Sequence, residues 1–175
     1  MSSKSVLSIA VLGAALFAAG GSQAQQQKPN PFDVVPDKMP FDVPYGAPIS
    51  LERADAVLAA AVAESKKRDW KLNCAVVDSG ANLVSFKRMD GAQLGSIAIA
   101  EHKARAAAKY RRETKLFENG VQNGVIYLLS LDDVIASRGG ILLMEGGKII
   151  GAIGCSGGTG SQDEVVAKAG AAVVK

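Results

Sequence analysis

The chain of 175 residues contains one histidine and two cysteines, which limits the metal chemistry open to it. A lone His102 cannot build a multi-histidine metal centre, and two distant cysteines cannot build a structural zinc or iron–sulfur site. Charge is nearly balanced, with 20 basic against 17 acidic residues. The resulting net charge of +3 is too weak to indicate a nucleic-acid partner. Hydrophobic residues make up 48% of the chain, as in a folded globular protein.

Proline is missing from the whole chain after Pro48, and all six prolines lie within residues 25–48. This spacing excludes a helix or an interior strand and predicts an extended, polyproline-like arm. Two interpretations of the arm remain open. It is either a disordered spacer, or a segment that packs on a neighbouring subunit through its apolar residues Phe32, Val34, Val35, Phe41, Val43 and Tyr45.

The first 24 residues have the pattern of a secretory signal peptide. Lys4 precedes an apolar run over residues 6–19, and small residues follow up to Ser22-Gln23-Ala24. The run is too short for a membrane span, which disfavours an uncleaved anchor. We therefore expect cleavage after Ala24, a periplasmic or secreted protein, and no membrane contact after cleavage. In an oxidising compartment, Cys74 and Cys155 can pair as a disulfide.

Residues 49–175 are expected to form one domain of mixed helices and strands. Ser50 caps a helix that ends in the charged residues 66–69, and Gly146-Gly147 joins two strands as a tight hairpin. The predicted elements are helices over 51–69, 96–112, 115–119 and 161–172, and strands over 72–77, 83–87, 141–145 and 148–155. Ser161 to Glu164 is expected to cap the last helix. Two tight hairpins predict an antiparallel sheet covered by helices, not a doubly wound dinucleotide-binding fold.

The predicted helix 96–112 has two different faces. Small apolar residues make a buried stripe, which predicts close packing against the sheet. The near-opposite face carries the one histidine and three cations, namely His102, Arg105, Lys109 and Arg112. Such a face is either simply solvated or a binding surface for a ligand that carries carboxylates.

The segment from Gly154 to Gly158 matches the G-x-S-x-G pattern of a hydrolase nucleophile elbow. In those hydrolases the histidine follows the serine, whereas His102 precedes Ser156. A structural glycine-rich turn is therefore the better interpretation. No other nucleophile or acid–base constellation is evident, which favours a binding protein over an enzyme.

Four motifs together resemble the GlcG/HbpS-like haem-binding family, which includes the C-terminal domain of PduO-type corrinoid adenosyltransferases. The motifs are Lys-Ala-Arg-Ala-Ala at 103–107, Arg-Gly-Gly at 138–140, Gly-Ala-Ile-Gly-Cys-Ser-Gly-Gly at 151–158 and Gln-Asp-Glu at 162–164. The resemblance covers residues 49–175. It implies a profilin-like α+β fold (α/β in the broad sense) with a five-stranded antiparallel sheet flanked by helices, assembly into a homo-oligomer, and binding of haem or a related tetrapyrrole.

The resemblance also gives the helix face a function. His102 is the candidate axial ligand of the haem iron, and Arg105, Lys109 and Arg112 are candidates to pair with the propionates. The expected function is sequestration, sensing or transport of the tetrapyrrole without turnover. The alternative is an enzyme, or an accessory to one, in the catabolism of a small oxidised metabolite or in corrinoid metabolism.

Overall fold

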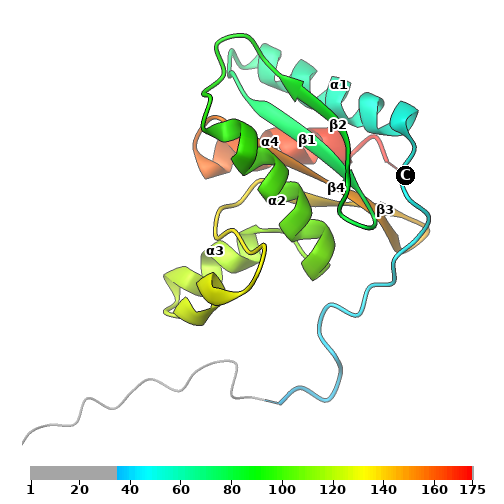
Figure 1. Ribbon diagram of the computed structural model, residues 1–175, viewed down its shortest axis with the longest axis vertical. Helices are drawn as coiled ribbons and strands as arrows, with labels where there is room; N and C mark the ends of the chain where they lie inside the picture. Colours follow the sequence, from blue (N-terminus) through cyan, green and yellow to red (C-terminus); the bar gives the residue numbers. More distant parts are fainter. Residues whose placement is uncertain (1–34, 175) are drawn as a thin grey trace, which may run out of the picture. The chain divides into compact units, whose positions relative to one another are not determined.

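An antiparallel sheet of four strands, in the order β2-β1-β4-β3, forms the centre of the fold (Figure 1). The strands are β1 (Asn73–Asp78), β2 (Leu83–Arg88), β3 (Gly140–Glu145) and β4 (Lys148–Ser156). This computed structural model describes residues 35–174. The predicted signal peptide over residues 1–24 and the first part of the arm lie outside the described residues.

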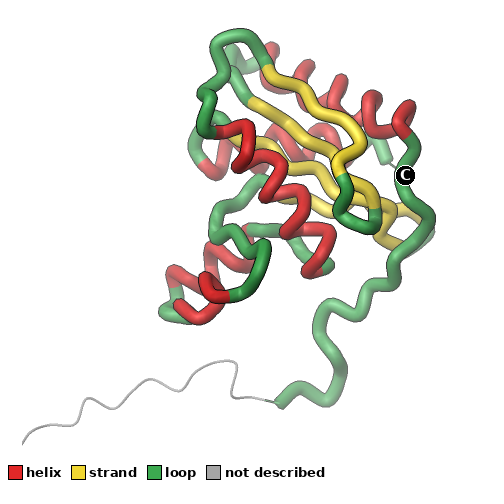
Figure 2. The backbone as a smooth tube through the Cα atoms, in the orientation of Figure 1, coloured by secondary structure: helices red, strands yellow, loops and turns green. Residues whose placement is uncertain are grey.

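Helices cover both faces of the sheet (Figure 2). They are α1 (Leu51–Lys67), α2 (Ser96–Tyr110), α3 (Lys115–Gln122) and α4 (Gly160–Ala171), with a 3-10 helix at Ile126–Ser130. Side chains alternate along β1, so Cys74 and Val76 pack against α1 and α4, whereas Ala75 and Val77 pack against α2. The sheet is therefore the middle layer of three.

The expected antiparallel α+β architecture is confirmed, but the strand count of five is wrong for residues 35–174. Four strands are present, and Tyr45 adds only an isolated parallel bridge to Ile149.

The cap of α4 lies earlier in the sequence than expected. The Thr159 hydroxyl accepts a hydrogen bond from the Gln162 N–H, and the Gln162 side chain accepts one from the Thr159 N–H. Ser161 is then inside the first turn and cannot be the cap.

The described end of the arm packs on its own domain. The hydroxyl of Tyr45 donates to the carbonyl oxygens of Ala108 and Lys109 at 3.0 and 3.1 Å, at the end of α2. Asp42 lies 3.6 Å from Arg111. This part of the arm is therefore packed on the domain and is not a disordered spacer, whereas its packing on a neighbouring subunit stays a prediction.

Close contact between α2 and β4 depends on small residues. A Cβ atom on Gly154 would lie 2.2 Å from the Ala100 carbonyl oxygen and 2.4 Å from the Ala104 nitrogen. Both distances are far below a van der Waals contact, so a side chain at this position would push the helix off the sheet. The alanine-rich stripe of α2 is thus needed for packing, as the sequence predicts.

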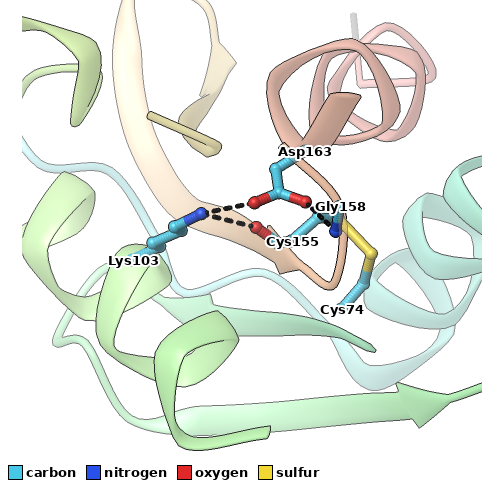
Figure 3. Close-up of a disulfide and its surroundings, with 5 residues drawn as sticks. All are labelled: Cys74, Lys103, Cys155, Gly158 and Asp163. Atoms are coloured by element: carbon cyan, nitrogen blue, oxygen red, sulfur yellow. Dashed lines mark hydrogen bonds and ion pairs between the residues drawn. A yellow bond between two sulfur atoms is a disulfide. The ribbon is translucent and has the colours of Figure 1, made fainter. Parts of the chain in front are cut away.

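Cys74 and Cys155 are joined by a disulfide between the two central strands (Figure 3). They are direct cross-strand partners in the register of β1 and β4, and 81 positions separate them in the sequence. Both are buried in the core formed with α1 and α4. The bond links the first and last thirds of the domain covalently.

We expect the double variant Cys74→Ala/Cys155→Ala to lose roughly 2–4 kcal/mol of unfolding free energy, because its unfolded chain regains the entropy of an open loop. Urea denaturation of the oxidised proteins measures the difference. Dithiothreitol should lower the midpoint of the wild-type protein and leave that of the variant unchanged. Equal midpoints for oxidised wild type and variant would contradict a stabilising bond.

Candidate functional site

The polar face of α2 brings three of the four predicted ligand-binding residues to one carboxylate. Asp133, in the loop after the 3-10 helix, accepts hydrogen bonds from Arg105 Nε at 3.3 Å and from Lys109 Nζ at 2.5 Å. The Nε2 atom of His102 lies 3.5 Å from Oδ1 of the same aspartate. We call these four side chains the Asp133 cluster. Sequence reasoning missed Asp133, because nothing in the loop indicates that it folds back onto the helix.

Electrostatics in this cluster favour a charged aspartate. Burial raises the pKa of Asp133, but the hydrogen bond from Lys109 and the charge of Arg105 outweigh burial and lower it overall. His102 Nε2 is buried and forms no hydrogen bond, although the side chain as a whole is 32% exposed. The buried Nε2 therefore lies near the carboxylate, while other atoms of the side chain are exposed.

Arg112 does not join the Asp133 cluster. Helix α2 ends at Tyr110, and Arg111 adopts the left-handed conformation that turns the chain away. The guanidinium of Arg112 then lies 3.6 Å from the ring centroid of Phe41 and 5.4 Å from that of Phe117. Burial lowers its pKa. Its role is to hold the arm against the domain.

A second ion pair of α2, between Lys103 and Asp163, is fully buried (Figure 3). Lys103 Nζ donates to Oδ2 of Asp163 at 2.7 Å and to the carbonyl oxygen of Cys155 at 3.3 Å. The other oxygen of Asp163 accepts the N–H of Gly158 at 3.0 Å. Burial raises the pKa of Asp163, and Lys103 opposes this shift. The pair thus joins α2, β4 and the start of α4.

The sequence contained a signal for this buried lysine. Lys103 is three residues after Ala100 and four before Ala107, which is the spacing of the buried stripe. The neighbouring Gly139, at a φ of +118°, makes room for the ammonium group, since a Cβ there would lie 3.2 Å from Lys103 Nζ. Gly140 also lies close to α2, since a Cβ there would lie 2.4 Å from the Lys103 carbonyl oxygen.

Arg138 is the centre of a third cluster of charged side chains. Its Nε and backbone N–H donate to the two oxygens of Glu118, each at 2.7 Å, and these bonds lower the pKa of Glu118. Glu164 lies 3.6 Å from Arg138 and accepts from Lys115 and Lys168. The cations of this region are therefore neutralised within the domain.

Two further cavities both have Trp70 in their lining. Their volumes are about 330 and 390 Å³, and none of the four predicted ligand-binding residues lines either.

Among the side chains of residues 35–174, no three histidines, cysteines or acids gather closely enough to hold a metal ion. No helix in that same range is long and apolar enough to cross a membrane.

We expect Lys103→Met to cost roughly 3–5 kcal/mol of unfolding free energy, because it leaves the buried Asp163 carboxylate without its cation. Arg53→Met is the matched control, since Arg53 pairs with Glu145 on the surface, and its loss should stay below about 1 kcal/mol. Denaturant unfolding measures both. Adding Asp163→Asn to Lys103→Met should recover part of the loss. Similar losses for Lys103→Met and Arg53→Met would contradict this role.

Comparison with known proteins places these features in a family. The model of the family "Haem degrading protein HbpS-like" matches residues 49–172. Protein GlcG of Escherichia coli K12 is 41% identical over 108 residues, which are 62% of this chain and 81% of GlcG.

Solved structures give the same result. HbpS of Streptomyces reticuli, solved as a double variant, is 27% identical and superposes with a TM-score of 0.70 over 81% of this chain and 97% of HbpS. PduOC, solved in complex with haem, is 26% identical with a TM-score of 0.67 over 74% of this chain and 96% of PduOC. The matched residues 49–172 include every strand and helix described above, and the chain belongs to the HbpS-like family.

Proposed function

We propose that this protein binds haem or a related tetrapyrrole on the polar face of α2, and that it sequesters, senses or transports this ligand. The observation that carries the proposal is the Asp133 cluster, in which one imidazole and two cations share one carboxylate. A structural relative of 26% identity, PduOC, was solved with haem, which supports the choice of ligand.

The residues present fit such a ligand. A metal-bound histidine commonly directs its other ring nitrogen at a carboxylate, which fixes the ring and raises its basicity. Nε2 of His102 faces Asp133 and so leaves Nδ1 as the nitrogen for an iron. Arg105 and Lys109 are 35% and 50% exposed, so they can exchange Asp133 for a propionate. Haem, when bound, supplies an iron that accepts one axial nitrogen.

The polar face of α2 does not supply an apolar wall for the macrocycle. Large apolar side chains are exposed on the neighbouring 3-10 helix, with Ile126 at 67% and Leu129 at 56%. A second copy of the chain would cover such residues and add the missing wall. The proposal therefore includes a homo-oligomer.

Haemin titration of the purified protein tests the proposal. We expect a shifted Soret band that saturates at a fixed ratio per chain, because the cluster is a single site. His102→Ala should move the band or weaken affinity at least about tenfold, equivalent to ~1.4 kcal/mol. Lys148→Ala is the control and should behave like wild type, because Lys148 is an exposed residue at the start of β4. An unchanged band and affinity for His102→Ala would exclude His102 as the ligand, and non-saturating binding to wild type would overturn the proposal.

Degradation of haem is the second candidate function, because the matching family model is described as haem degrading. The same titrated sample distinguishes it from storage. On addition of ascorbate in air, a degrading protein loses its Soret band with multiple turnovers, whereas a carrier keeps it.

Export is part of the same proposal and rests on the sequence of residues 1–24. We expect the protein recovered from the exported fraction of expressing cells to begin at Gln25, because the small residues Ser22 and Ala24 suit the signal peptidase. Intact-mass spectrometry measures this start. A full-length product confined to the cytoplasm would contradict it.

A further inference from the structure

The two cavities beside Trp70 share three of their lining residues, Asp69, Trp70 and Lys71. These residues connect the end of α1 to the start of β1. The larger cavity, of about 390 Å³, extends to the end of β2, and the smaller, of about 330 Å³, extends to Gly157 and Gly158 after β4. Volumes of this size are typical of sites for small molecules.

Unpaired positive charge gathers at the larger cavity. Four cations line it, namely Lys66, Lys71, Lys87 and Arg88, against the two acids Asp69 and Asp90. None of the four forms an ion pair or a side-chain hydrogen bond within the described residues 35–174. Other cations of the domain differ, since Arg105, Lys109 and Arg138 are each paired with a carboxylate. A free cation in a concave site favours an anionic ligand.

The cavity also has an apolar wall. Val62, Trp70 and Met89 contribute to its lining. The guanidinium of Arg68 lies 5.0 Å from the ring centroid of Trp70 and pairs with Glu64, so the indole is held from one side. A fixed indole is a suitable platform for a flat ring, because aromatic pairs stack with an offset.

We propose that this cavity binds a planar aromatic carboxylate, with the ring on Trp70 and the carboxylates on Lys66, Lys71, Lys87 and Arg88. A small inorganic anion would leave the apolar wall bare, and an uncharged ring would make no use of the four exposed cations. Both features are used only by a ligand that combines a flat ring with negative charge. The site is distinct from the Asp133 cluster and does not depend on haem.

Trp70 is the one tryptophan of the chain, so its indole N–H gives a single NMR signal that reports directly on the cavity. Terephthalate is the probe, because it has one flat ring and two carboxylates. We expect a saturable shift of the Trp70 signal on titration in ¹H–¹⁵N spectra of the intact mature protein. Acetate and benzyl alcohol, which have only the charge or only the ring, should give at most weak and non-saturating shifts.

Charge-removing variants complete the test. Lys87→Gln/Arg88→Gln should weaken terephthalate binding at least tenfold, whereas the control Lys67→Gln/Lys148→Gln removes two exposed charges outside the cavity and should bind like wild type. Lys66→Gln is a second variant, should the first not fold. Protein saturated with haemin should still bind terephthalate. The proposal is overturned if terephthalate gives no saturable shift, if the cavity variants keep wild-type affinity, if acetate or benzyl alcohol saturates equally well, or if haemin displaces the probe.

Discussion

The close contact between α2 and β4 is the constraint on which the rest of the structure depends. Gly154 has no side chain that would separate α2 from β4, and the small alanines of α2 pack against the sheet. Lys103 is the one long charged side chain of this packed surface, and its head is dehydrated. A buried ammonium is tolerated only next to a hydrogen-bonded anion, so Asp163 must stand at the start of α4. The position of α4 is thus tied to that of α2 through the sheet.

Charged side chains are distributed unevenly over the domain, and they form two kinds of surface, one with paired charges and one with unpaired charges. Around Arg138 and Asp133, acids and bases lie in contact, and their pairing holds α3, the following loop and α4 on the domain. At the larger cavity beside Trp70, the four lining cations have no acidic partner in contact within residues 35–174. Paired surface charges serve mainly the fold, while unpaired charges in a cavity are free to hold a ligand. The Asp133 cluster lies between these cases, because its exposed cations can exchange partners.

Local patterns predicted most of the fold, and contacts between distant segments account for what was missed. The hairpins, the helix after Ser50 and the small stripe of α2 are set by neighbouring residues, and all appear in the structure. His102 and Asp133 are 31 positions apart in the sequence, and no periodic pattern of residues predicts that they lie close together. The cations at Trp70 are likewise spread over residues 66–88 and converge only through the pairing of β1 with β2.

The disulfide gives a physical reason why the smaller cavity beside Trp70 keeps its shape. Cys74 and Cys155 are paired in register, and one step further along the same strands Asn73 faces Ser156. The next residues, Leu72 and Gly157, already line the smaller cavity. A covalent bond two residues from this wall prevents the ends of β1 and β4 from separating, and it also fixes the start of β1 next to Lys71 and Trp70, which line both cavities. A protein exported to an oxidising compartment would acquire this rigid wall only after export.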